Sequence, residues 1–258
     1  MLPLLRTALA VTALAAALSA AALTPLPPLA DSQQAIVVVT DDWDASQGRL
    51  QAYERKGTDG AWRPHGPAFT VAVGRNGSAW GAGRVVRPND KPQKQEGDGR
   101  SPAGIFSIGP AFGYAPRIAS AMPYQQMQAT HYCMDVPASP HYNRIVDAKD
   151  VGADAVVGST EPMRLDLHNK GDVRYREGFV IEHNGLAVPG RGSCIFAHLW
   201  RKPGEATAGC TAMDPRHMQA LMAWLKPDAR PVFILMPKPL YRDWERAWDM
   251  PALGGVAP

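Results

Sequence analysis

Short apolar runs alternate with turn-forming segments along most of the chain, from about residue 34 onwards. Runs that are rich in β-branched residues, or that alternate between apolar and polar residues, indicate β-strands. The Gly-, Pro- and Asn-rich segments between these runs fit turns. The pattern predicts seven strands, at residues 35–40, 49–55, 69–74, 104–109, 179–183, 193–200 and 231–236.

One helix is well marked between the last two predicted strands. Asp214 can cap its N-terminus, and Pro215 suits the first helical position. Apolar residues then recur at the i, i+3, i+4 and i+7 positions of a helical stripe, at Met218, Leu221, Met222 and Leu225. The sequence therefore predicts a mainly β domain with one helix in its C-terminal part and short peripheral helices.

This domain is expected to span residues 34–237 and to be followed by a tail, residues 238–258. The tail carries Trp244 and Trp248, and either packs as a short helix or stays loose. A Pro-rich stretch before the domain, residues 23–33, is typical of an extended linker.

The first 22 residues carry an export pattern. Arg6 is the only charge before Asp31, and an apolar run of 16 residues spans Ala8–Leu23. This run suits a signal peptide and is short for a membrane span, which takes roughly 20 residues. Small residues end the run, so cleavage after Ala21 or Ala22 is expected, with an uncleaved N-terminal anchor as the alternative. Both interpretations place the domain outside the cytoplasm, in the periplasm or cell envelope.

Composition narrows the class of protein. The chain is 45% apolar and 20% charged, which is typical of a globular protein. Gly and Pro contribute 24 residues each, so loops are expected to be abundant. The net charge of +3 and the lack of a basic cluster argue against a nucleic-acid partner. No second run is long enough to suggest a stable membrane partner, and three cysteines are too few for a disulfide framework.

Cys210 and His198 are the candidate catalytic residues. A thiol near a helix N-terminus and beside a histidine has its thiolate favoured, and Cys210 lies just before the predicted helix. Gly209 lets a substrate approach closely, and the amides of Gly209 and Cys210 are candidates for an oxyanion hole. His198, on a predicted strand, is the natural general base. Two alternatives stay open: Cys210 is a packing residue, or the nucleophile is Cys194, which lies within a strand pattern that offers no oxyanion amides.

Four segments together resemble the YkuD family of L,D-transpeptidases. They are DGRSPAGIF at residues 98–106, Glu-His-Asn at 182–184, SCIFAHLW at 193–200 and TAGCTAM at 207–213. The resemblance implies a β-rich L,D-transpeptidase catalytic fold and a cofactor-free cysteine acyl transferase that acts on peptidoglycan stem peptides. By that resemblance, Cys210 would attack the third stem residue and release D-Ala. An amine of a neighbouring stem would then resolve the thioester and form a 3→3 cross-link. His198 would carry the proton, with its ring oriented by a backbone carbonyl just after it.

The chain departs from the usual family signature of Ser or Thr followed by His, Gly and Cys. Ala208 stands in the histidine position, and the gap between His198 and Cys210 is shorter than is typical. Two alternatives therefore accompany the transpeptidase. The first is a hydrolase or carboxypeptidase of the same fold, in which water resolves the thioester. The second is a wall-binding module without activity.

Several further residues have both a functional and a structural interpretation. Cys133 and Cys194 either form a disulfide, as suits an exported protein, or stay as free thiols. His183 either lines the substrate cleft or holds a turn. Arg201 either grips a substrate carboxylate or is a surface charge. Trp200 either stacks on substrate or packs in the core.

The loop that carries Asp135, Tyr142 and Asn143 favours a structural clasp beside the site. No pair of histidines or cysteines shows the spacing of a zinc site, so no metal ligands are predicted.

Overall fold

A ten-stranded sheet forms the body of the protein. The computed structural model describes residues 27–85 and 88–254. Within them the main sheet follows the order β10-β11-β12-β3-β2-β1-β13-β5-β4, and β6 pairs with β5. Its strands are β1 (Gln34–Thr40), β2 (Gln47–Glu54), β3 (Arg63–Ala72), β4 (Ser78–Trp80), β5 (Ser101–Gly113), β6 (Tyr124–Gln126), β10 (Glu177–Ile181), β11 (Phe196–Leu199), β12 (Thr211–Met213) and β13 (Val232–Pro237).

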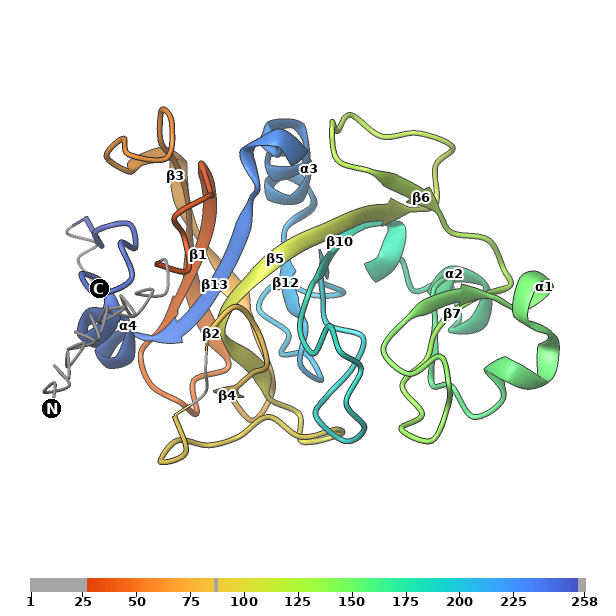
Figure 1. The fold of residues 1–258 in the computed structure, drawn as a ribbon. Coiled ribbons are helices and arrows are strands. Elements are labelled where there is room, and N and C mark those ends of the chain that lie inside the picture. The colour runs from red at the N-terminus through yellow and green to blue at the C-terminus, as the bar shows by residue number, and fades with distance from the viewer. Residues whose placement is uncertain (1–26, 86–87, 255–258) are drawn as a thin grey trace, which may run out of the picture.

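The sheet closes on itself because β10 pairs with β5 as well as with β11. The parallel neighbours β1 and β13 are buried over nearly their whole length. Burial on both faces explains why both strands read as continuous apolar runs in the sequence. The core therefore lies inside the curved sheet (Figure 1).

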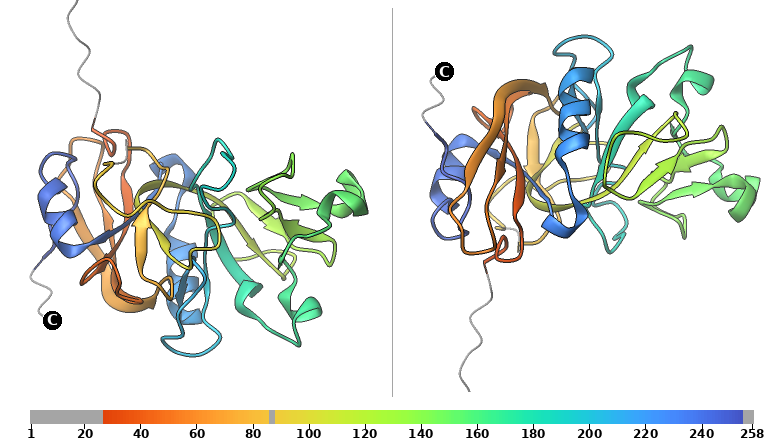
Figure 2. Two further views of the ribbon diagram at one scale, coloured as in Figure 1. Left: turned by 90° about the horizontal axis from the view of Figure 1, so that it is seen from below. Right: turned by 90° about the horizontal axis from the view of Figure 1, so that it is seen from above.

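A separate lobe fills the connection between β5 and β10, residues 114–176, and is called the lobe below. It lies beside the sheet, on the side away from α4 (Lys238–Trp244), in all three views (Figures 1 and 2). Its elements are short: β7 (His131–Cys133), β8 (Ile145–Asp147), α1 (Ala148–Val151), η1 (Ala153–Val156), β9 (Glu161–Pro162), α2 (Leu165–His168) and η2 (Arg174–Arg176). The strands β8, β7 and β9 form a small antiparallel sheet.

The predicted fold class is confirmed: the protein is β-rich with a few short helices. The predicted helix is α3 (Pro215–Trp224), and the Asp214 carboxylate accepts the Arg216 N–H at 2.9 Å as its cap. A one-turn helix, η3 (Pro227–Ala229), follows it. In the tail, α4 forms, and Trp244 and Trp248 pack against the core.

Three strands differ markedly from the prediction in length. β3 starts at Arg63, well before the predicted segment, and ends at Ala72. β5 continues well beyond the predicted segment, to Gly113. β11 starts only at Phe196, because Cys194 has a left-handed backbone with φ 55° that a strand does not allow. Short elements and bent strand ends are where an apolar pattern is least informative.

The predicted signal peptide and the start of the predicted linker lie outside the described residues. The rest of that linker, residues 27–33, is not extended but turns and packs against the sheet. Leu29 is fully buried, and its carbonyl accepts a hydrogen bond from the Arg55 guanidinium at 2.5 Å. Among the residues that the structure describes, no helix is long and apolar enough to cross a bilayer.

Candidate active site

Cys210 and His198 lie on one face of two paired strands. β11 and β12 are parallel, with Ala197 opposite Thr211 and His198 opposite Ala212. Side chains alternate along a strand, so this register places Cys210, just before β12, on the same face as His198. Phe196 lies opposite Cys210, and its N–H donates to the thiol sulfur at 3.3 Å. The structure therefore brings together Cys210 and His198, the candidate catalytic residues predicted from the sequence.

The Cys210 thiol carries its proton and acts as a hydrogen-bond donor. It donates to the Cys194 carbonyl at 3.5 Å, and in the described part of the chain no hydrogen bond joins it to the His198 ring. Cys210 is 9% exposed and His198 is 2% exposed. Catalytic hydrogen bonds are often formed only once a substrate is bound. The geometry is that of a resting site.

A polar frame fixes the backbone of the nucleophile. The Thr207 hydroxyl donates to the Cys210 carbonyl at 2.6 Å, and the Ser101 hydroxyl donates to the same oxygen at 3.2 Å. Ser101 in turn accepts the Gly74 N–H at 2.9 Å. Gly209 has φ 156°, and a Cβ there would lie 3.1 Å from the Arg100 carbonyl oxygen, so glycine is required. The frame consequently holds Cys210 from three separate segments.

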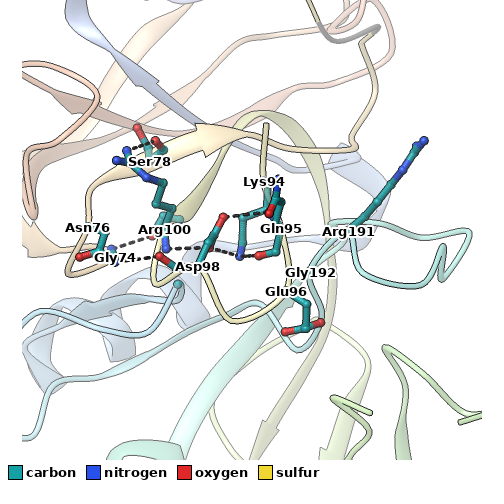
Figure 3. Close-up of polar contacts among 12 residues, drawn as sticks. Gly74, Asn76, Ser78, Lys94, Gln95, Glu96, Asp98, Arg100, Arg191 and Gly192 are labelled. Carbon is teal, nitrogen blue, oxygen red and sulfur yellow. Dashed lines mark hydrogen bonds and ion pairs between the residues drawn. The ribbon is translucent and has the colours of Figure 1, made fainter. Parts of the chain in front are cut away.

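Asp98 extends this frame outward (Figure 3). Its carboxylate accepts from Lys94 Nζ at 2.5 Å, from the Gln95 N–H at 2.8 Å and from the Arg100 N–H at 2.9 Å. The Arg100 guanidinium donates to the Ser78 carbonyl at 3.0 Å. The Lys94 side chain is 3% exposed, and burial of a charge is tolerated only where it is paired and hydrogen-bonded. Residues 98–101 (DGRS) therefore support the loop that carries Cys210.

Burial makes both members of the catalytic pair neutral. It raises the pKa of the Cys210 thiol to about 12 and lowers the pKa of His198 to about 4. The expectation of a thiolate stabilised by a helix N-terminus was wrong. Strand β12 separates Cys210 from α3, so the thiol lies in an apolar cluster instead of at the end of a helix.

The tautomer of His198 is defined by its neighbour. Nδ1 lies 2.7 Å from the Leu199 carbonyl oxygen, which can only accept, so Nδ1 carries the proton. This is the orienting carbonyl that was expected just after the histidine. Nε2 then presents a lone pair and, within the described residues, has no hydrogen-bond partner. His198 can therefore accept a proton at Nε2, as a general base requires.

Of the two backbone amides predicted to form an oxyanion hole, those of Gly209 and Cys210, only one is available in the structure. The Gly209 N–H donates to the Thr207 hydroxyl at 3.1 Å, so Gly209 is already satisfied, contrary to the expectation. The Cys210 N–H carries no hydrogen bond among the described residues and is the remaining backbone donor at the nucleophile. Gly209 therefore shapes the loop that carries Cys210.

A family model described as the L,D-transpeptidase catalytic domain, YkuD, matches residues 35–234. The chain belongs to the YkuD family. No curated protein and no solved structure matches the chain. Membership supports a function of the L,D-transpeptidase kind on peptidoglycan. The match covers the whole sheet except the ends of β1 and β13, and so includes both Cys210 and His198.

A disulfide joins the lobe of this YkuD domain to the segment just before β11. Cys133 in β7 is bonded to Cys194, two residues before β11. Asn143 adds polar bonds: its amide donates to the His183 carbonyl at 2.8 Å and accepts the Cys194 N–H at 2.9 Å. Tyr142 donates to the Glu96 carboxylate. The loop is thus the structural clasp that the sequence suggested.

A cavity of about 240 Å³ opens between the lobe and the sheet. Cys194 and Phe196, the two residues whose backbones contact the thiol, line its inner wall. Arg144 and Glu182, both exposed, supply charges of opposite sign. Neither Cys210 nor His198 is among the residues that line this cavity.

The remaining site predictions have different outcomes. His183 is buried and holds a turn: Nδ1 accepts the Ala82 N–H at 3.2 Å, and Nε2 donates to the Arg191 carbonyl at 2.8 Å. It also lines the cavity, and a role of His183 in substrate binding stays a prediction. Arg201 forms an ion pair with Glu205 on the surface, and half-buried Trp200 bonds through its backbone to Met213. A direct substrate role for these two residues stays a prediction.

Two residues of the site escaped the sequence-based interpretation. Tyr175 packs against His198 with ring centroids 5.2 Å apart, and Glu161 accepts the Tyr175 hydroxyl. They come from η2 and β9, elements too short to give a periodic pattern. In the described part of the chain, no group of three or more potential ligands is arranged for a metal ion.

Proposed function

We propose that the protein is an exported cysteine acyl transferase that forms 3→3 cross-links between peptidoglycan stem peptides. The observation that carries the proposal is the pairing of β11 with β12, which places Cys210 and the free Nε2 of His198 on one face. Family membership supplies the class of substrate. The missing motif histidine, replaced by Ala208, leaves His198 as the base of the site.

The first half-reaction forms a thioester. Nε2 of His198 takes the thiol proton as Cys210 Sγ attacks the carbonyl carbon of the third stem residue. The Cys210 N–H faces the developing oxyanion. The bond to the terminal D-Ala nitrogen breaks, and the imidazolium gives its proton to that nitrogen, so D-Ala leaves as a neutral amine.

The second half-reaction resolves the thioester. An amine of a neighbouring stem attacks the acyl carbon and gives a proton to Nε2 of His198. The thiolate that leaves then takes this proton back, and the resting neutral pair is restored. A neutral pair suits this cycle because the proton moves only in step with the attack, which protects the thiol from side reactions in an oxidising compartment.

Export is a separate part of the proposal. The pattern of residues 1–22 supports it, and a Cys133–Cys194 disulfide is typical of oxidising compartments. The full-length chain should be recovered with the periplasmic or envelope fraction. N-terminal sequencing then distinguishes cleavage after Ala21 or Ala22 from a retained anchor, and recovery in the cytoplasm would contradict export.

The decisive experiment is product analysis with a disaccharide-tetrapeptide. Residues 27–258 are incubated with it and the products are read by mass. A dimer that has lost one D-Ala supports the transpeptidase. A tripeptide alone would show that water resolves the thioester, which replaces the proposal with the carboxypeptidase. Unchanged tetrapeptide and no acyl-enzyme on Cys210 would overturn the assignment of Cys210 as the nucleophile. The Cys210→Ala variant is the negative control.

A further inference from the structure

We propose that Tyr175 and Glu161 form a positioning pair for the catalytic residues. In this pair the tyrosine ring fixes the plane of the His198 imidazole. The Glu161 carboxylate, which accepts the tyrosine hydroxyl, places a negative charge on the lobe side of the buried cluster that contains Cys210. The inference rests on the proposed function only for the chemistry of the substrate; the contacts themselves are independent of it.

The ring of Tyr175 is packed on several sides. Tyr175 is 4% exposed, and its ring meets that of His198 edge-on, at 5.2 Å between centroids and 71° between planes. Phe196 and Phe112 meet it in the same way, at 5.6 Å and 5.8 Å. Edge-to-face contacts of this kind define ring orientation as well as burying area.

His198 needs such a contact because only one of its nitrogens is anchored. The bond from Nδ1 to the Leu199 carbonyl leaves the ring free to tilt about that bond. Tyr175, from η2, packs against the ring from outside the two strands that carry Cys210 and His198. The tyrosine therefore sets the direction of the Nε2 lone pair relative to the thiol.

Glu161 connects the pair to the thiol by a second route. In the lobe, Glu161 lies opposite Cys133 in the β7–β9 register. Cys133 is bonded to Cys194, whose carbonyl accepts the Cys210 thiol. Tyr175 and Cys210 also belong to the same buried cluster. Glu161 is thus linked to Cys210 from the lobe side, through Cys133 and Cys194 on one route and through Tyr175 on the other.

The charge on Glu161 is poorly compensated. Its carboxylate accepts the Tyr175 hydroxyl, and no ion pair to it occurs in the described residues. The charged and titratable groups that face it are Asp135, Asp172, Arg174, Tyr175 and Cys210. Arg174 is itself paired with Asp172.

Burial raises the pKa of Glu161 to about 7, and its charge adds to the burial that raises the pKa of Cys210. Glu161 therefore titrates near neutrality, where it can act on the thiol.

The first test measures alkylation of Cys210 by iodoacetamide across pH 6–10, read by intact mass. In Glu161→Gln, which keeps a partner for the tyrosine hydroxyl, the profile should move to lower pH. The rate at a fixed pH below the midpoint should then rise by about tenfold for each unit of that move. Glu177→Gln, a surface carboxylate bonded to Gln219, is the matched control and should follow the parent. A profile for Glu161→Gln that coincides with the parent would overturn the role of the charge.

The second test separates ring from hydroxyl by single-turnover formation of the acyl-enzyme. Tyr175→Phe keeps the ring and should retain the rate within about fivefold, whereas Tyr175→Leu should lose roughly 50-fold in rate with little change in KM. Equal losses in the two variants would refute positioning by the ring. Tyr124→Phe, a lobe tyrosine bonded to Ala115, controls for loss of a hydroxyl.

The two tests also distinguish this inference from the proposed function. Alkylation needs no stem peptide, so a shifted profile in a protein that leaves the tetrapeptide unchanged supports the pair and contradicts the transpeptidase. An unshifted profile in a protein that forms the cross-linked dimer supports the transpeptidase and contradicts the role of the Glu161 charge. Should Tyr175→Leu fail to fold, the Glu161→Gln profile and the Tyr175→Phe rate still decide.

Discussion

The two sides of the site are built from different interactions. On one side, hydroxyls and amides from three segments hold the backbone of Cys210, and an ion pair between Lys94 and Asp98 supports them. On the other side, the Tyr175 ring packs against His198, and a single carbonyl bonds to it. The nucleophile is held by directed bonds, and the base is held by packing.

The difference separates two tasks of an active site. Hydrogen bonds fix where an atom lies, and each contributes about 1 kcal/mol. Packed rings exclude water, and exclusion of water determines which protonation states are stable. The polar frame should therefore control the rate through position, and the aromatic side should control it through proton affinity. Changes on each side are expected to leave different signatures.

Loss of the base should have the largest effect. His198→Gln removes the proton acceptor, so formation of the acyl-enzyme should fall by about 1,000-fold, or about 4 kcal/mol at the transition state. Single-turnover mass spectrometry measures this rate. In the parent, the rate should rise as the pH increases through about 4, where His198 loses its proton. A variant within tenfold of the parent would show that another group is the base.

The same histidine makes a stability prediction. Its folded pKa, about 4, lies below the ordinary value of 6.5, so between these values the unfolded chain binds a proton that the folded chain does not. Stability should therefore fall as the pH is lowered from 6.5 to 4. His198→Gln should show a smaller fall in urea unfolding at the two pH values.

The disulfide is expected to give the next largest effect. Cys133 and Cys194 are 61 residues apart, and their bond ties the lobe to the aromatic side. Replacing both by serine should lower the free energy of unfolding by about 2–4 kcal/mol. Urea unfolding of the parent and the variant measures this loss.

The disulfide variant also sharpens the comparison between the two sides. Because the lobe would admit water, the pKa of Cys210 should drop, and alkylation at pH 8 should be faster. Unchanged alkylation without loss of stability would mean that the clasp residues, and not the disulfide, hold the lobe in place. Asn143→Ala in the disulfide-bonded chain is the control for the clasp.

A single hydroxyl of the polar frame should have the smallest effect. Thr207→Val keeps the shape but removes the bonds to the Cys210 carbonyl and from the Gly209 N–H. Ser101 still donates to that carbonyl, so acyl-enzyme formation should fall by only about tenfold. The pH profile should keep its midpoint. Thr207→Ser should restore the rate, and a shifted midpoint would contradict the separation of tasks.

Much of the sheet could be predicted from the sequence, because its long strands are buried or alternate regularly. The Asp214-Pro215 start and the apolar stripe of α3 were equally clear. Cys210 and His198 could be predicted because a thiol and an imidazole are reactive side chains that the sequence shows directly. The neutral state of the pair was not predictable, since it depends on burial by the lobe. In the same way, the three residues of β12 are too few to reveal that a strand, and not the helix, follows Cys210.

The lobe leaves and rejoins the sheet at neighbouring positions. Gly113, where β5 ends, is the Cα partner of Glu177, where β10 begins. Paired residues in antiparallel strands lie about 5 Å apart, so the lobe spans no distance and imposes no stretch on the sheet. The outer loops of the lobe can therefore change in length without moving the strand ends, whereas Cys133, Glu161 and Tyr175 tie its inner side to the site. Insertions in those outer loops should leave the pairing of β11 with β12 intact.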